Sequence, residues 1–374
     1  MTEPSRKVRE GLETTNTGSS TAVGNASPES APLWMMFTEG TRKLATRSVV
    51  WVFIIDALLV LFFGLESPGH VFVHSANIQD LLLDGSEIVL LSVGEAILLG
   101  AALLDISVGA NLVLSSAVGA EVMLHISGSS AQVASGIYPH EALGVTVGIV
   151  ACILTGMIFG AVNGYLVAWL RINPLIATLG TAGIGTGLAN VFTNGFNVAY
   201  IPAVVQTDFG AKMFGIMPAS ALLVITLCVV SWLVMTKTRF GVHSLVLGSS
   251  AISAIRSGLN VRRQTMALFM MMGAFSGVAG LIDFTRFATT DVGGHTTDAL
   301  GAIAGAVIGG TSIFGGNVSV GGAVLGALLT VIVEVGLIIL NVSAFYQQIA
   351  IGFILLAAVA IDQRRRGRRN AVVR

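Results

Sequence analysis

The sequence predicts an all-α, polytopic membrane protein with about ten transmembrane helices and both termini in the cytoplasm. Three observations predict this fold class: 54% of the 374 residues are hydrophobic, only 11% are charged, and apolar runs near 20 residues recur along the chain. Soluble domains carry about a quarter charged residues, so the surface that a soluble chain needs is missing. A helix of about 20 apolar residues crosses the hydrocarbon core with its backbone hydrogen bonds satisfied internally.

The apolar runs place the spans in chain order. They cover residues 49–65, 86–104, 106–126, 142–170, 174–193, 219–236, 264–285, 299–314, 320–340 and 345–361, and the run 299–314 is short for a full span. We therefore assign residues 49–362 to a membrane domain. The polar segment 1–48 is expected to be a disordered cytoplasmic tail, and residues 363–374 form a basic cytoplasmic tail.

The placement of basic residues gives the orientation. Short loops rich in Lys and Arg stay in the cytoplasm. With the N-terminus inside, eighteen of the twenty basic residues fall on the cytoplasmic side, and only Lys212 and Arg286 fall outside. An odd number of spans would put one basic terminus outside, so the charge distribution favours an even number.

Glycines at four-residue spacing within the spans predict close helix packing, because small residues let two helix backbones approach. The series are Gly156, Gly160 and Gly164; Gly273 and Gly277; Gly301, Gly305 and Gly309; and Gly322 and Gly326. Such faces also suit helices that slide past one another, and the spacing alone does not separate the two roles.

Ionisable residues in or beside the spans are costly and are therefore functional candidates. They are Asp56, Glu95, Asp105 and Glu334. Glu95 is the best candidate for a carboxylate that faces a cavity, with pairing to a neighbouring helix as the alternative. Asp105, in the stretch LLDISVGAN, either caps the start of the next helix or contacts a ligand.

Signatures of catalysis and metal binding were sought and are absent from the sequence. No lysine follows a glycine, so no phosphate-binding P-loop is present, and no G-x-S-x-G elbow occurs. His140 and Glu141 lack the second histidine of a zinc protease, and His70 and His74 have no acidic or cysteine ligand nearby. We predict no catalytic residue, no metal site and no cofactor bound by this chain.

Two glycine-containing segments on the predicted inner side have local structure of their own. The stretch GGTSIFGGNVSVGG, residues 309–322, predicts a re-entrant turn or a tight helical hairpin, and the echo of SVGA at Ser107 and SVGG at Ser319 indicates an internal duplication. The loop 237–264 carries five basic residues and a helical stretch, 250–257, closed by Gly258. This short helix is either a protrusion for a cytoplasmic partner or an ordinary amphipathic connector.

Four stretches, in order and at span boundaries, carry a family resemblance. They are LLDISVGANL (103–112), NPLIATLGTAGIGTGLANVFTNG (173–195), TRFGVHSLVLGSSAISAIRSGLNVRR (238–263), and AIAGAVIGGTSIFGGNVSVGGAVLGALL through NVSAFYQQIAIGFILLAAVAID (302–362). With these, the chain resembles the permease subunits of bacterial ATP-binding-cassette (ABC) importers for monosaccharides, the ribose and xylose type. The resemblance covers about residues 50–362.

The resemblance implies a multi-pass subunit of the bacterial inner membrane that imports a sugar and is not an enzyme. Its partners would be a second permease copy, identical or different, separate ATPase subunits that bind ATP and Mg²⁺, and an extracytoplasmic sugar-binding protein; no nucleic acid is implied. Residues 49–362 would be the permease domain, and the loop 237–263 would couple it to the ATPase.

The resemblance and the polar residues together give the expected site residues. Those of the coupling loop are Thr238, Arg239, Phe240, Gly241, Ala254, Ser257 and Gly258, and candidates for the translocation pathway are Glu95, Asp105, Ser107, Asn163, Thr178, Thr311 and Ser312. The chain departs from the family pattern at Ala251 and Ile252, where relatives commonly carry acidic residues, and at Asn317, where relatives often carry a basic one.

Three alternatives remain open at this stage. The first is a permease of the same superfamily that carries branched-chain amino acids or nucleosides, although the stretch VSAFYQQI favours the sugar branch. The second is an ion-coupled secondary transporter, which would need an intramembrane carboxylate such as Glu95 or Glu334. The third is a membrane scaffold without transport activity, although the sequence shows no extra domain that would support this role.

Overall fold

The computed structural model describes residues 33–209, 212–213, 215 and 217–372. The chain divides into two compact units, Met1–Gly40 and Thr41–Arg374, and the second unit holds every predicted site residue. Of the predicted N-terminal tail, residues 1–32 lie outside the described residues. Residues 33–48, which the sequence assigns to the same tail, belong instead to the first helix, which begins at Leu33 and continues through the apolar run that starts at residue 49.

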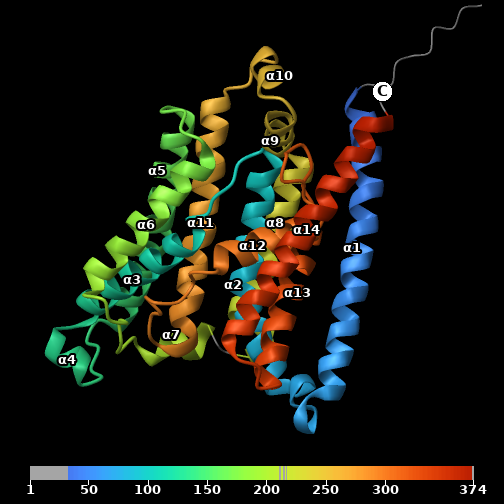
Figure 1. Ribbon diagram of the computed structural model, residues 1–374. Helices are drawn as coiled ribbons and strands as arrows, with labels where there is room; N and C mark the ends of the chain where they lie inside the picture. The colour runs from blue at the N-terminus through green and yellow to red at the C-terminus, as the bar shows by residue number, and fades with distance from the viewer. Residues whose placement is uncertain (1–32, 210–211, 214, 216, 373–374) are drawn as a thin grey trace, which may run out of the picture. The chain divides into compact units, whose positions relative to one another are not determined.

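Helices dominate the described residues (Figure 1). In chain order the elements are α1 (Leu33–Glu66), the 3-10 helix η1 (Pro68–Val73), α2 (Ser75–Gly100), α3 (Val108–Ser127), α4 (Ser130–Ala134), α5 (Glu141–Ala168), α6 (Pro174–Thr193), α7 (Ala203–Phe209), β1 (Lys212–Met213), β2 (Met217–Pro218), α8 (Ala219–Lys237), α9 (Arg239–Ser249), α10 (Ala251–Arg256), α11 (Val261–Phe287), α12 (Asp298–Ile308), α13 (Val320–Ile339) and α14 (Ala344–Val372). The two short strands pair antiparallel.

Seven of the described helices are long and apolar enough to cross a membrane. They are α1 from Val49 onward, α3, α5, α6, α8, α11 and α13. The chain is therefore a helical, multi-pass membrane protein, as the composition predicts. Three further predicted spans coincide with α2, with the short helix α12 and with α14; the total of ten and the orientation stay predictions.

Element boundaries differ from the apolar runs in two places. The run 299–314 is helical only to Ile308, because Gly310, Gly315 and Gly316 adopt positive φ and turn the chain back toward α13. At the other end, α14 continues through the predicted basic tail to Val372. The glycine-rich stretch thus forms the loop of a helical hairpin, which confirms one of the two predicted structures.

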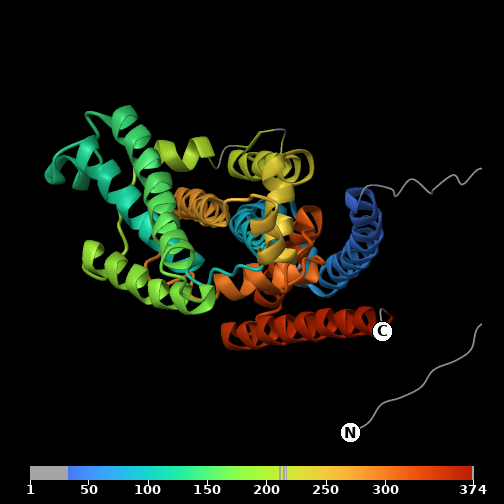
Figure 2. The same ribbon diagram turned by 90° about the horizontal axis from the view of Figure 1, so that it is seen from above.

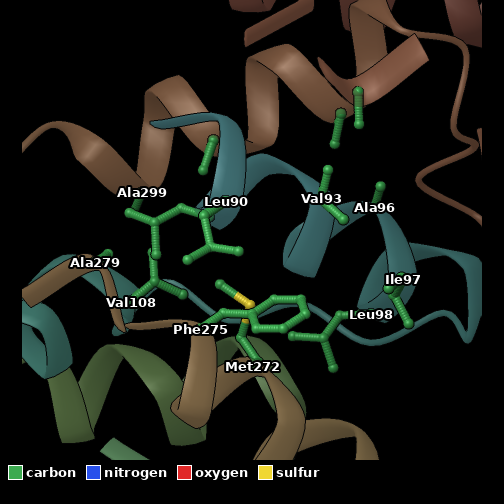
Figure 3. Packing of buried hydrophobic residues seen from close by; sticks show 14 of the residues in the cluster. Leu90, Val93, Ala96, Ile97, Leu98, Val108, Met272, Phe275, Ala279 and Ala299 are labelled. Atoms are coloured by element: carbon green, nitrogen blue, oxygen red, sulfur yellow. The ribbon is translucent and has the colours of Figure 1, made fainter. Parts of the chain in front are cut away.

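Helix α2 lies at the centre of the main apolar core. Almost every residue from Gly85 to Gly100 is buried, and the helix contacts α8, α11, α12 and α13. Figure 3 shows the packing around Leu98, Met272 and Phe275. Since protein surrounds this part of α2, it can carry polar residues that a lipid-facing helix would exclude.

Glycines bring two helix pairs into backbone contact. A side chain at Gly273 of α11 would collide with the carbonyl oxygen of Gly156 of α5, and one at Gly326 of α13 would collide with that of Gly305 of α12. Figures 1 and 2 show α5 beside α11. These contacts confirm the predicted close packing. Gly301 is an exception, since a side chain there would meet only Ile88 of α2 at ordinary distance.

The contacts between helices are duplicated within the chain. Helix α3 contacts α5, α6 and α11, and in the same way α12 contacts α13, α14 and α2. Likewise α11 packs on α5 as α2 packs on α13. The set α2, α3, α5 and α6 therefore corresponds to the set α11, α12, α13 and α14. This agrees with the duplication that the SVGA and SVGG echo indicates.

We predict that Gly273→Ala lowers the free energy of unfolding by about 1–3 kcal/mol, because the methyl group overpacks the contact between α11 and α5. Gly321→Ala is the matched control: a side chain there meets nothing, so stability should be unchanged or rise by up to about 1 kcal/mol from helix propensity. Thermal unfolding of the purified protein in detergent measures both. Equal effects at the two positions would contradict the packing argument.

Candidate functional site

A break in the helical structure between α2 and α3 holds the first buried polar network. Residues 101–107 are not helical, and within them Asp105 is only 1% exposed. Its Oδ1 atom accepts hydrogen bonds from the backbone N–H of Ser107, at 2.8 Å, and from the Ser107 hydroxyl. Asp105 thus fixes the turn that leads into α3, but it does not cap this helix: Ser107 occupies the N-cap position and makes no side-chain cap hydrogen bond.

The network extends from this break to α5 and α6. Asn163 of α5 donates to the Ser107 hydroxyl at 2.8 Å and to Asp105 Oδ2 at 3.4 Å. Thr181 of α6 donates to Asn163 Oδ1 at 2.7 Å. All four side chains are buried. The structure therefore joins three predicted pathway residues and adds Thr181, which lies one helical turn after the predicted Thr178.

Burial and hydrogen bonding act in opposite directions on the network's carboxyl group. It raises the pKa of Asp105 above its ordinary value, because the charged form loses its water shell, while the hydrogen bonds from Ser107 and Asn163 act in the opposite direction. Ionised Asp105 consequently depends on these donors.

The other predicted pathway residues lie outside this network. Glu95 is fully buried in α2 and interacts electrostatically with Asp105, although neither of its carboxylate oxygens has a partner at hydrogen-bonding distance among the described residues. Thr178 donates within its own helix. Thr311 and Ser312 belong to the loop between α12 and α13, where Thr311 accepts a hydrogen bond from the backbone of Ser319.

A second buried polar group lies where the segment 288–297 leads into α12. We call it the His295 cluster, made of Glu87 (α2), Asp283 (α11), His295 and Asp298 (α12). His295 Nδ1 lies 2.7 Å from Asp298 Oδ2, and Nε2 lies 3.3 Å from Asp283 Oδ1. Glu87 Oε2 lies 4.0 Å from Nδ1. One imidazole thus faces three carboxylates from three helices.

Neighbouring groups hold the cluster in place. The hydroxyl of Ser116 in α3 donates to Asp283 Oδ2 at 2.9 Å, and Asp84 and Arg286 form an ion pair beside it. Burial alone would lower the pKa of His295, but the hydrogen bonds to Asp283 and Asp298 outweigh burial and raise that pKa to about 12. The surrounding carboxylates therefore favour the protonated, positively charged form of the His295 imidazole.

The sequence analysis did not identify the His295 cluster. Glu87 and His295 are far apart in the chain, and only folding brings them together. One signal was available, because Asp283 lies inside the apolar run 264–285, where an ionisable residue is a functional candidate.

The inner loop contains two helices where one was predicted. The expected helix is present as α10: the Ser250 side chain accepts from the backbone N–H of Ser253, and Gly258 follows with a φ of 81°. Helix α9 precedes it. Ala254 is fully buried, so it supports the loop from within, whereas Ile252 and Ile255 are 66% and 63% exposed. These two exposed isoleucines were not among the predicted contact residues.

Comparison with known proteins places these features in a family. Residues 77–359 match the profile of the family described as branched-chain amino acid transport system / permease component. The chain is 32% identical to the D-allose transport system permease protein AlsC of Escherichia coli, over 83% of this chain and 90% of that protein. No solved structure matches the chain.

Two further relatives align over most of their length. The chain is 33% identical to the L-arabinose ABC transporter permease protein AraH of Azospirillum brasilense, over 92% of this chain and 96% of that protein. It is 31% identical to the ribose import permease protein RbsC of Bacillus subtilis, over 82% of this chain and 90% of that protein.

We predict that Asn163→Leu destabilises the protein by about 1–3 kcal/mol, because Asp105 and Thr181 each lose a buried partner. Asn190→Leu is the matched control, since Asn190 is exposed on α6 and bonds only a carbonyl of its own helix. Thermal unfolding in detergent compares the two. If both variants unfold at the wild-type temperature, the network does not stabilise the helix break.

Proposed function

Because the chain belongs to the branched-chain amino acid transport system / permease component family, we propose that this multi-pass membrane permease subunit imports a monosaccharide as part of an ATP-driven ABC importer. One observation carries the choice of substrate. Relatives that align over more than four-fifths of the chain are named for D-allose, L-arabinose and ribose, although the family's description refers to branched-chain amino acids.

The proposed division of labour follows from what the sequence lacks. A P-loop needs lysine after glycine, and this sequence has no such pair. ATP and Mg²⁺ are therefore proposed to bind a separate ATPase subunit, with no cofactor on this chain. An extracytoplasmic binding protein would deliver the sugar, and both termini would lie in the cytoplasm.

The α9–α10 loop is the proposed docking point for the ATPase. Helix α10 is exposed on every residue except Ala254, and its two outward isoleucines lie in a loop with five basic residues. Large exposed apolar side chains among polar neighbours are typical of protein contacts. Buried Ala254 and the turn at Gly258 would give this surface a fixed shape, and Thr238, Arg239, Phe240, Gly241 and Ser257 would complete the coupling loop.

A second permease copy is proposed to pack on α6. One face of this helix presents Ile176, Gly180, Gly183, Gly187 and Val191 at helical spacing. Among the described residues, a side chain at any of these three glycines would find nothing within 4 Å. Small residues that leave a helix surface open allow another helix to approach closely in a membrane.

The proposed pathway residues lie next to the helix break. Asp105, Ser107, Asn163 and Thr178 are buried in this arrangement, as are Glu95 and Thr311, while Ser312 is half-buried. A sugar would reach them only after neighbouring helices separate. The glycine contacts between α5 and α11 support such movement, since flat backbone faces interlock few side chains. ATP-driven motion of the coupling loop would provide the force.

Uptake by cells tests the substrate class. In a strain that lacks this gene, uptake of one labelled monosaccharide should be lost and restored by the wild-type gene, while uptake of branched-chain amino acids and nucleosides stays unchanged. Deleting the ATPase gene should abolish the same uptake, and a protonophore should not. Loss of amino acid or nucleoside uptake instead would contradict the sugar assignment, and protonophore sensitivity with an intact ATP pool would support ion coupling.

Ile255→Asp tests the docking point. The change should leave the permease folded, because the side chain is exposed, and lower ATPase co-purification and sugar uptake by about tenfold or more, the loss expected for an apolar contact worth at least about 1.4 kcal/mol. Ile137→Asp, on an exposed side chain of the predicted outer side, is the control and should retain both activities. Normal co-purification of the Ile255 variant would exclude this surface.

A further inference from the structure

We propose that the His295 cluster is a binding site for a divalent transition-metal ion, for which Zn²⁺ is the test ion, with Glu87, His295 and Asp298 as the protein ligands. Each residue offers one ligand atom, and the three atoms lie within 4.8 Å of one another. They come from α2, from the segment before α12 and from α12 itself. This inference is independent of the transported substrate.

The spacing of the ligand atoms suits a small cation. Zinc bonds of about 2.0–2.1 Å to nitrogen and oxygen place tetrahedral ligands roughly 3.3 Å apart. The distances from His295 Nδ1 are 2.7 Å to Asp298 Oδ2 and 4.0 Å to Glu87 Oε2. These values lie on either side of the tetrahedral spacing, and all three ligand atoms lie within 4.8 Å of one another, so the side chains would have to close around the ion.

The opposite side of the imidazole carries the support that metal-binding histidines usually have. Such a histidine donates its second ring N–H to a carboxylate, which fixes its orientation and raises its basicity. His295 Nε2 lies 3.3 Å from Asp283 Oδ1, and Ser116 holds the other Asp283 oxygen. Nδ1 is thereby directed at Asp298 and Glu87.

Glu87 supplies the ligand from α2. The residue is only 8% exposed, yet its carboxylate approaches His295 no closer than 4.0 Å, beyond hydrogen-bonding distance. Buried carboxylates need a counter-charge, and both His295 and Arg286 act on this one electrostatically. A metal ion between Glu87 and His295 would give the carboxylate a cation in direct contact.

A metal ion would take the place of the proton shared by His295 and Asp298. His295 Nδ1 and Asp298 Oδ2 lie 2.7 Å apart, at hydrogen-bonding distance, and metal binding would release the Nδ1 proton to solvent. The ion would connect α2 to α12 close to the start of α3, where the His295 carbonyl oxygen packs against Gly109.

Metal content of the purified full-length permease tests the site. After removal of metal with a chelator, equilibration with Zn²⁺ and desalting, we expect about one zinc ion per chain, and X-ray absorption should show one imidazole among ligands at about 2.0–2.1 Å. Glu87→Gln and Asp298→Asn should lose the ion. Asp283→Asn should keep the ligands but bind Zn²⁺ about 10–100-fold more weakly.

Matched controls lie on α3. Glu121 and His125 are exposed, four residues apart, and line an open surface hollow, so Glu121→Gln and His125→Gln should leave zinc content unchanged. Wild-type protein without zinc, or equal zinc in wild type and Glu87→Gln, would overturn the proposal and leave a doubly protonated imidazole held by carboxylates. If a variant fails to fold, X-ray absorption of the wild type decides: absence of imidazole scattering overturns the site.

Discussion

Backbone contact between helices at glycine is the interaction on which the rest of this structure depends. In a membrane, apolar side chains gain little by leaving lipid for protein, so helices associate through close van der Waals packing. At Gly156 and Gly273 the α5 and α11 backbones touch, and at Gly305 and Gly326 those of α12 and α13 touch. Helices α11, α12 and α13, with α8, pack around α2 and keep lipid away from its polar residues.

That enclosure makes two interruptions of helical structure possible. Unwound backbone is tolerated at membrane depth only where protein satisfies its polar groups. Before α3, Asp105 accepts a hydrogen bond from the backbone N–H of Ser107. Before α12, Asp283 of the His295 cluster accepts from the backbone N–H of Asp291 at 3.5 Å, and Asn197 accepts from that of Val292 at 2.9 Å. The two interruptions adjoin, because Gly109 of α3 packs against the His295 carbonyl oxygen. The starts of α3 and α12, with their buried polar groups, thus form one polar centre in an apolar protein.

The sequence patterns differed in how much of the structure each one predicted. Apolar run length identified the helices, since spanning a bilayer imposes a length on each segment independently of its neighbours. It misplaced the end of α12, because the positive φ of Gly310 depends on the hairpin that forms there. The four-residue spacing of glycines predicted which helix faces pack closely, but it did not predict that α5 packs against α11. Local sequence patterns predicted α10 and its caps. They did not predict that Ile252 and Ile255 are exposed, because this depends on Ala254 facing the interior of the protein.

The sequence by itself determined that this is a helical membrane protein, which helices have close-packing faces, and that it resembles ABC permeases. Each of these rests on composition or on residues near one another in the chain. Only the tertiary structure decided which polar residues meet. Asp105 was visible as a candidate, but its partner Asn163 comes from α5, and Thr181, which donates to Asn163, comes from α6. No local pattern joins Glu87, Asp283 and His295. Buried polar groups find partners across helix interfaces, so their pairing follows from packing and not from sequence spacing.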